Sequence, residues 1–314
     1  ITFQNKIKMK KVLITGGTGT VGKSFIKRYY NDYEFHSISR NETSISELKN
    51  EFPKVNCYIG NICNQEHMMN LFCKIKPEIV IHAAALKHIN LAEENPSSAS
   101  EINVMGSMNI IKASIRAKVA LTVGVSTDKA CNPDSVYGYS KRMMEKMFLE
   151  YHNEDTKFVC TRFANVANSN GSVIPFWISE EKKGNPLKLT DPDMNRLMFS
   201  KKDSAELIQK AISSSTMCHD PFILCKMMKN VNLLKLANVL SDKPVEIIGK
   251  RPGEKLNETL ISVKELPNTV LLKDYVFILH KPEEIQGLNL TKEHSSVTAE
   301  SMTINEMEEL VWEQ

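Results

Sequence analysis

The stretch KVLITGGTGTVGKSFIKRYY (residues 11–30) decides the fold. Its first five residues are mostly apolar and β-prone, whereas residues 21–30 show the apolar spacing of a helix. Gly16, Gly19 and Gly22 lie between these segments, and glycine lets the backbone turn sharply and approach a ligand closely. A strand, a glycine-rich turn and a helix in this order bind the pyrophosphate of a dinucleotide at the helix N-terminus. The stretch therefore predicts a dinucleotide site, with a merely structural turn as the alternative.

The same alternation continues through the first half of the chain. Strands interleaved with helices predict βαβ units and a buried parallel sheet. The expected fold class is α/β, a Rossmann-like doubly wound parallel sheet with a smaller C-terminal substrate-binding lobe. We expect the Rossmann domain over residues 1–165 and mainly the substrate-binding lobe over 166–314, in which about 197–227 returns to the sheet through PFILC (221–225). The remaining strand-like runs are 33–39, 55–60, 78–84, 119–126 and 157–163, and helical patterns cover 64–75, 96–116, 137–151, 202–214 and 231–240.

Composition narrows the function classes. The chain has 314 residues, 42% hydrophobic and 25% charged, which is typical of a globular protein. A net charge of +3 does not favour nucleic acid as a partner. Seven cysteines without a C-x-x-C pair indicate reduced thiols and a cytoplasmic location, and no apolar run is long enough to predict membrane insertion. His82 and His88 lack the spacing of metal ligands, so we expect no metal site.

The end of the second strand bears on the choice of dinucleotide. An acidic side chain there would accept a hydrogen bond from the ribose 2′-hydroxyl of NAD. The sequence at this position is SISRNE (37–42), with Ser39 and Arg40. Because an arginine fork suits a phosphate, NADP is favoured and NAD is less favoured. The alternative is that Arg40 is solvated and Glu42 takes the ribose.

Other strand ends supply further cofactor contacts. Asn61 and Ile62 follow the third strand and suit the adenine, and HAAALKH (82–88) follows the fourth with small residues where a cofactor must pass. Lys87 can reach the cofactor or a substrate phosphate. The residues assigned to the cofactor are Gly16, Thr18, Gly19, Thr20, Val21, Gly22, Ser39, Arg40, Asn61, Ile62, Ala83, Ala84, Ala85, Lys87, Tyr137, Lys141 and Val166.

A second stretch, VSTDKACNPDSVYGYSK (125–141), points to proton chemistry. Tyr137 and Lys141 are four residues apart and so share one helix face. An adjacent ammonium and a positive nicotinamide favour the phenolate, which could then take a proton from an alcohol while hydride leaves.

These motifs together resemble a known family. ITGGTGTVG, SRNE, HAAALKH, STDKA with YGYSK, RFANVANSNGSVIP, TDPDMNR and RPGEK are similar to those of extended short-chain dehydrogenase/reductases, and within them of the C5-inverting UDP-N-acetylglucosamine 4,6-dehydratases. The resemblance spans residues 11 to at least 260. It implies NADP, a UDP-sugar substrate, a role in glycan biosynthesis and a homo-oligomer, either dimer or hexamer.

The resemblance also assigns catalytic roles. Oxidation at C4 makes the C5–H removable as the C6 hydroxyl leaves, so proton handlers are needed at O4, C5 and O6. Tyr137 serves O4, Thr127 bonds the C4 oxygen, Asp128 protonates the departing water and Lys129 acts at C5. Asp128 must be kept protonated by burial, and Lys129 must be neutral when it acts, which nearby cations and desolvation would favour. The alternative is that Asp128 and Lys129 form a surface pair at a strand end.

Substrate contacts are likewise implied by the resemblance. Departures from the family pattern are Asn61 in place of an aspartate, Ala164 in place of a glycine and Asn170 in place of an arginine. Competing hypotheses are a C4 epimerase, a keto-sugar reductase, and a non-catalytic NADP-binding sensor or scaffold. The expected substrate-binding residues are Lys87, Asn165, Ser172, Val173, Pro175, Arg196, Arg251 and Glu254.

Overall fold

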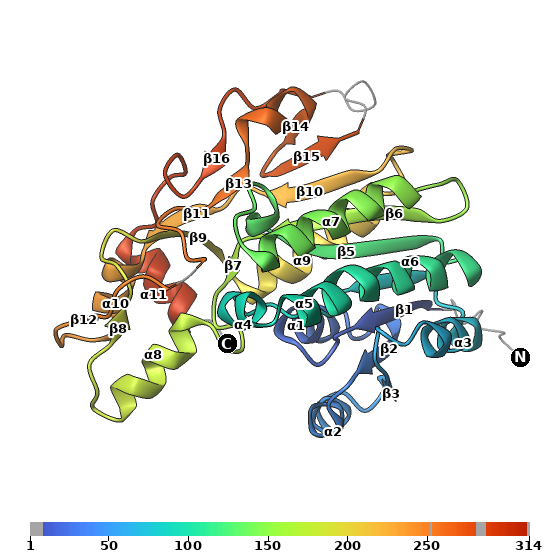
Figure 1. Cartoon of the computed structure of the whole chain (residues 1–314), viewed down its shortest axis with the longest axis horizontal. Helices are drawn as coiled ribbons and strands as arrows, with labels where there is room; N and C mark the ends of the chain where they lie inside the picture. The colour runs from blue at the N-terminus through green and yellow to red at the C-terminus, as the bar shows by residue number, and fades with distance from the viewer. Residues whose placement is uncertain (1–8, 252, 281–286, 313–314) are drawn as a thin grey trace, which may run out of the picture.

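A nine-stranded sheet forms the centre of the computed structural model, which describes residues 9–251, 253–280 and 287–312. The strand order is β14-β15-β10-β6-β5-β4-β1-β2-β3 (Figure 1). Neighbouring strands are parallel from β10 to β3, which confirms the doubly wound α/β class. The strands are β1 (Lys10–Thr15), β2 (Tyr33–Ser39), β3 (Asn56–Ile59), β4 (Ile79–His82), β5 (Leu121–Thr127), β6 (Lys157–Phe163), β10 (Phe222–Lys226), β14 (Thr269–Leu272) and β15 (Tyr275–Leu279).

Helices cover both faces of this sheet. In Figure 1, α6 and α7 lie in front of the strands and α9 lies behind them. Because both faces are covered, consecutive residues Val12, Leu13 and Ile14 of β1 are all fully buried. The helices are α1 (Thr20–Arg28), α2 (Glu42–Glu51), α3 (Gln65–Ile75), α4 (Ile89–Glu94), α5 (Pro96–Ser100), α6 (Gly106–Arg116), α7 (Val136–Tyr151) and α9 (Lys201–Ser214), with a π-helical turn η1 (Glu101–Met105) between α5 and α6 and a 3₁₀ turn η2 (Asp128–Ala130) after β5.

Two local features differ from the sequence patterns. The predicted helix over 96–116 contains the π-helical turn η1, and α2 has no counterpart among the predictions. Helix α2 begins where the Asn41 side chain accepts from the backbone N–H of Ser44, a standard N-cap.

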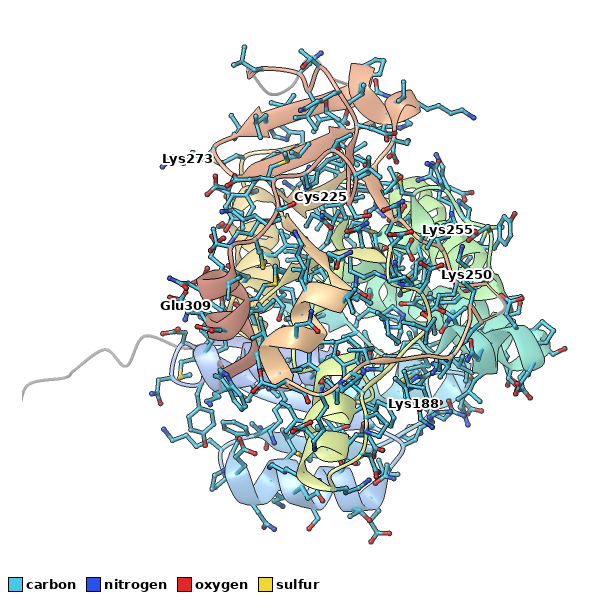
Figure 2. All side chains as sticks on the ribbon, turned by 90° about the vertical axis from the view of Figure 1, so that its left-hand side faces the viewer. Lys188, Cys225, Lys250, Lys255, Lys273 and Glu309 are labelled. Carbon is cyan, nitrogen blue, oxygen red and sulfur yellow. The ribbon has the colours of Figure 1, made fainter. Side chains whose placement is uncertain are left out.

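A smaller lobe lies beyond the carboxyl ends of the parallel strands (Figure 1). It has a core of its own around Trp177, Leu187, Leu236 and Val311. Figure 2 faces this lobe, with Lys188 and Lys250 on its exterior. Its elements are β7 (Asn165–Val166), α8 (Val173–Lys182), β8 (Lys188–Leu189), β9 (Asn195–Phe199), β11 (Lys229–Asn232), α10 (Leu233–Leu240), β12 (Glu246–Ile247) and α11 (Ile304–Trp312). The remaining elements, β13 (Thr259–Ile261), η3 (Val263–Asn268) and β16 (His294–Ser295), lie near β10, β14 and β15 (Figure 1), and Leu260 and Ile261 join the core of the main sheet.

The second half contributes more to the main sheet than expected. PFILC becomes β10, parallel to β6, whereas residues 195–199 form β9 of a small sheet with β7 and β11. Strands β14 and β15 then add an antiparallel hairpin at the edge, closed by a turn with Lys273 at φ 55°. The division into two domains stays a prediction. Among the described helices, none combines the length and apolarity needed to cross a bilayer.

Candidate active site

A cavity of about 800 Å³ opens at the carboxyl ends of the parallel strands, between the sheet and the smaller lobe. Ligands of doubly wound folds bind at this edge. The predicted residues that line it are Gly16, Thr18, Gly19, Thr20, Val21, Gly22, Ser39, Arg40, Ile62, Ala83, Ala84, Ala85, Lys87, Thr127, Lys129, Tyr137, Lys141, Asn165, Val166, Ser172, Arg251 and Glu254. Asn61, Asp128, Val173, Pro175 and Arg196 are not among the lining residues.

The turn after β1 has the shape of a dinucleotide cradle. Gly16 has a φ of 76°, and a Cβ at this position would lie 2.9 Å from the backbone nitrogen of Ala84. A Cβ on Gly22 would lie 2.7 Å from the Cα of Gly17, so both positions need glycine. Gly19 is the N-cap of α1 and supplies no capping side chain, so first-turn N–H groups remain for an anion. The residues present fit a dinucleotide.

The end of β2 presents hydroxyls and a cation. The hydroxyls of Thr18 and Ser39 are 2.7 Å apart, and Arg40 follows at the exposed rim. In the described part of the chain, the one carboxylate lining the cavity is that of Glu254. Asn61 turns its amide oxygen to the backbone N–H of Cys63, 3.1 Å away, which leaves Ile62 at the cavity wall.

The proton-handling residues meet where β5 ends. Thr127 is the last residue of β5, Asp128 and Lys129 form η2, and Tyr137 lies in the first turn of α7. A Cβ on Gly138 would lie 2.6 Å from the carbonyl oxygen of Lys129, so this glycine lets α7 approach η2 closely. The sequence segments 127–129 and 137–141 are therefore brought together.

Hydrogen bonds join these side chains into one chain. Tyr137 bonds to the Thr127 side chain, and Thr127 Oγ1 donates to Asp128 Oδ1 over 2.9 Å. Lys129 Nζ donates to the same oxygen over 3.0 Å. Asp128 is fully buried and the Lys129 side chain is 15% exposed, which contradicts a surface pair. Within the described residues, Asp128 Oδ2 has no hydrogen-bond partner.

The surroundings of Lys129 differ from the expectation. Burial opposes its ammonium, but the carboxylates of Asp128 and Glu258 outweigh this and raise the pKa of Lys129 above its ordinary value. Glu258 Oε1 lies 3.5 Å from Lys129 Nζ. Nearby cations were expected to favour the neutral amine; Arg196 does act in that direction, but the two acids prevail. In the absence of substrate, Lys129 is therefore an ammonium.

The surroundings of Tyr137 and Lys141 also differ from the expectation that Lys141 is the cation acting on Tyr137. Burial raises the pKa of Tyr137 to about 12, and the cation that opposes this is Lys129. Lys141 Nζ instead lies 3.1 Å from Met144 Sδ, and burial lowers the pKa of Lys141 to about 8. Sequence spacing placed both on one helix face but could not reveal their different partners.

A buried ionic network supports the segment that carries these groups. Arg162 is fully buried and donates to both oxygens of Glu145, over 2.9 Å each, and to both oxygens of Glu265, over 3.0 and 3.1 Å. Glu145 accepts from Ser126 Oγ over 2.7 Å, and Glu265 accepts from Cys131 Sγ over 3.2 Å. Ser126 and Cys131 flank residues 127–130, so both ends of that segment are held by the network.

Several of these residues were not identified from the sequence. An arginine inside the apolar run KFVCTRF is a signal of buried acidic partners, although it does not say which acids. Glu258 follows LN and precedes TLI with no distinguishing pattern. His88, Ser126 and Ser169 also line the cavity.

The far side of the cavity is formed by loops of the smaller lobe. The Asn170 carbonyl accepts from Lys87 Nζ over 2.5 Å, and its N–H donates to Thr20 Oγ1 over 3.0 Å, so this loop closes onto the glycine-rich turn. Burial lowers the pKa of Lys87. Asn165 lines the cavity while donating to the Leu197 carbonyl over 3.0 Å.

The substrate residues expected farther along the chain divide into two groups. Arg251 and Glu254 line the cavity, with the Arg251 N–H 3.3 Å from Glu254 Oε2. Val173 and Pro175 lie in the first turn of α8, outside the lining. Arg196 is buried, and its guanidinium donates hydrogen bonds to backbone carbonyls, including that of Leu256 over 3.0 Å.

Comparison with known proteins identifies the family. The family model described as polysaccharide biosynthesis protein matches residues 12–280. The chain belongs to this family. This family assignment confirms the resemblance found in the sequence. A UDP-N-acetylglucosamine 4,6-dehydratase (inverting) of Campylobacter jejuni is 34% identical over 282 residues, which cover 86% of this chain and 82% of that protein. A protein named UDP-glucose 4-epimerase from Rickettsia massiliae is also 34% identical, over 90% of this chain and 86% of its own.

Solved structures agree on the fold of this polysaccharide biosynthesis family member. The structure of Pen from Bacillus thuringiensis superposes with a TM-score of 0.89 at 28% identity and covers 98% of both chains. A dTDP-glucose 4,6-dehydratase from Streptomyces venezuelae, solved with NAD and TYD bound, has a TM-score of 0.70 at 18% identity, with 78% of this chain and 86% of that chain covered. At this identity the likeness shows the fold alone.

Proposed function

We propose that the chain catalyses the NADP-dependent 4,6-dehydration of UDP-N-acetylglucosamine with inversion at C5, giving UDP-2-acetamido-2,6-dideoxy-β-L-arabino-hexos-4-ulose. The observation that carries the proposal is the hydrogen-bonded chain from Tyr137 through Thr127 and Asp128 to Lys129 at the cavity wall. A dehydratase needs separate proton handlers at O4, O6 and C5, and this chain offers a phenol, a carboxyl group and an amine side by side.

Each side chain has a distinct task in this reaction. The nicotinamide, when bound, supplies a hydride acceptor and donor. Tyr137 takes the proton of the O4 hydroxyl, and Thr127 holds the C4 oxygen. Once C4 is a carbonyl, the C5–H becomes acidic, and Lys129 removes it as a neutral amine. The proton that Tyr137 takes from O4 passes through Thr127 to Asp128. Asp128, whose Oδ2 has no partner among the described residues, then gives a proton to the C6 hydroxyl, which leaves as water.

NADP is the proposed cofactor because of the residues around the end of β2. The glycine cradle and the N-terminus of α1 would hold the diphosphate. Arg40 at the rim would pair with a 2′-phosphate, and the described lining holds no carboxylate near it that would select the NAD ribose. Arg251, Ser172 and Lys87 would hold the UDP-sugar from the opposite wall. The homo-oligomer and the cytoplasmic location stay predictions.

A second candidate is a nucleotide-sugar C4 epimerase. It is favoured by the Rickettsia relative named UDP-glucose 4-epimerase, and it would share the use of Tyr137 at O4. An epimerase, however, has no need for an acid at O6 or a base at C5. Lys129 lines the cavity and Asp128 is buried in contact with it, and this arrangement supports dehydration.

One experiment distinguishes the two reactions. The purified protein is incubated with NADP and UDP-N-acetylglucosamine in deuterated water, and the sugar is followed by NMR. Dehydration predicts loss of the C6 hydroxyl, deuterium at C5 and inverted C5 configuration. An unchanged sugar, or its C4 epimer without deuterium at C5, would refute the proposal.

A further inference from the structure

Lys129 presents a chemical problem. Removal of the C5 proton requires a neutral amine, yet the two carboxylates beside Lys129 favour its ammonium. Loss of that proton to solvent would leave two buried carboxylates facing each other with no cation between them. A nearby group that can take the proton removes this difficulty.

Glu258 is placed to do so. Its carboxylate is buried, and Oε1 lies 3.5 Å from Lys129 Nζ, on an element separate from Asp128. It does not line the cavity, so it reaches substrate only through Lys129. Its own backbone is fixed, because its N–H donates to Ser296 Oγ over 3.0 Å and its carbonyl accepts from the Ser296 N–H over 2.8 Å.

The charges around Glu258 suit a group that alternates between acid and carboxylate. Burial and Asp128 favour the protonated form, whereas the cations favour the carboxylate, and on balance the pKa of Glu258 is raised. The groups that face it are Asp128 and Lys129 of η2, Arg196 of β9 and Lys255 of the preceding loop.

We propose that Glu258 is a positioning residue that accepts a proton from Lys129 and so delivers the neutral amine to the substrate. This inference rests on the proposed dehydration. The N–H bond of the Lys129 ammonium breaks and an O–H bond forms on Glu258, which leaves a neutral amine and a neutral acid. The amine then takes the C5 proton and becomes an ammonium again. Inversion requires that the sugar present its opposite face before the same ammonium reprotonates C5. The Glu258 proton then returns to Lys129, and the pair is reset.

The distance of 3.5 Å must shorten for the transfer. Catalytic hydrogen bonds are often long before substrate binds and tighten in the complex. The proton moves within a pair of zero net charge, so turnover needs no proton exchange with solvent at this step.

The test compares full-length Glu258→Gln and Glu258→Asp with the wild type, using NADP and UDP-N-acetylglucosamine in deuterated water over a range of pH. Glu258→Gln is expected to lower kcat at neutral pH by about 100-fold, the lower range for loss of an acid–base group. The ratio of wild-type to variant kcat should shrink as pH rises, because solvent then deprotonates Lys129. Glu258→Asp keeps an acid and should recover part of kcat. Glu300→Gln, at an exposed surface pair, is the matched control and should match wild type.

Other outcomes would overturn the proposal. If Glu258 only stabilised the lysine charge, its removal would lower the pKa of Lys129 and leave kcat unchanged or higher at neutral pH. A kcat reduced by one constant factor at every pH would indicate a structural role. If Glu258→Gln does not fold, Glu258→Asp decides. A reduced kcat whose ratio to the wild-type value changes with pH supports the proposal, and a kcat that is unreduced, or reduced by one constant factor at every pH, overturns it.

A second measurement needs no turnover. Acetylation of Lys129 by acetic anhydride, followed by mass spectrometry across pH, should begin at lower pH in Glu258→Gln than in wild type. An unchanged onset would show that the two groups do not interact. If wild type itself places no deuterium at C5, the proposed dehydration fails; if wild type reacts and Glu258→Gln reacts equally well, only the role of Glu258 fails.

Discussion

Replacing Arg162 by methionine tests the buried network that holds the catalytic segment. Arg162 is fully buried and makes hydrogen bonds to Glu145, Glu265 and the Leu260 carbonyl. Methionine fills part of the volume but leaves two buried carboxylates without their main cation. Removing one partner of a buried ion pair costs about 3–5 kcal/mol.

The pKa of Glu265 gives a second measure of how much the network contributes to the free energy of unfolding. Burial alone would raise the pKa of Glu265, but the Arg162 guanidinium and the bonds from Ser262 and Cys131 bring it from 4.5 to about 2. At about 1.4 kcal/mol per pH unit, this corresponds to about 3 kcal/mol of stability. Because the folded-state pKa is depressed, this stability is present above pH 4.5 and is lost as pH falls from 4.5 toward 2.

Urea unfolding and thermal melting measure the effect. Arg162→Met should lose about 3–5 kcal/mol, lower the midpoint of melting by about 6–20 °C, and show a weaker fall in stability between pH 4.5 and 2. Arg28→Met, at the exposed pair with Glu206, is the matched control and should lose at most about 1 kcal/mol. A loss below about 1 kcal/mol in Arg162→Met would refute the reasoning.

Three further changes test the site. Lys129→Ala should still bind UDP in calorimetry but lose C5 deuteration by at least about 100-fold; unchanged turnover would mean that another group is the base. Arg40→Asp should shift the ratio of NADP to NAD affinity toward NAD by at least about tenfold, because a carboxylate repels a 2′-phosphate, and an unaltered ratio contradicts the role of Arg40. Gly16→Val should abolish dinucleotide binding measured by fluorescence, since its Cβ would lie 2.9 Å from the Ala84 nitrogen; retained affinity contradicts the cradle.

The part of the fold that could be predicted is the part encoded locally. Strands β1, β2, β4, β5 and β6 are mostly buried, so each appears in the sequence as a short apolar run between turn signals. The edge strand β3 has no buried residue. Helix α2 was missed because its capping residue, Asn41, follows directly on the cofactor motif. The edge hairpin β14–β15 was assigned to the lobe, because nothing in its own residues tells which sheet it will join.

The site shows the same division. The motif placed Asp128, Lys129 and Tyr137 near one another, and they are joined in the structure. The expectation that the surroundings of Lys129 favour its neutral amine was wrong, because they include Glu258, which comes from a distant part of the chain. Glu265 reaches Arg162 in the same way. Charge states of buried groups are set by tertiary neighbours, and spacing along the sequence does not carry that information.

The negative and positive charges around η2 are equal in number, and this neutrality limits which proton transfers the site can support. Asp128 and Glu258 can each carry a negative charge, and Lys129 and Arg196 each a positive one, all in buried surroundings. A proton moved between two members of such a group changes no net charge, whereas a proton exchanged with solvent leaves an uncompensated buried charge that costs several kcal/mol. Arg196 also fixes the Leu256 carbonyl, two residues before Glu258, so it both balances the charge and holds the chain that carries the acid. A site built this way favours a reaction in which protons leave the substrate and return to it.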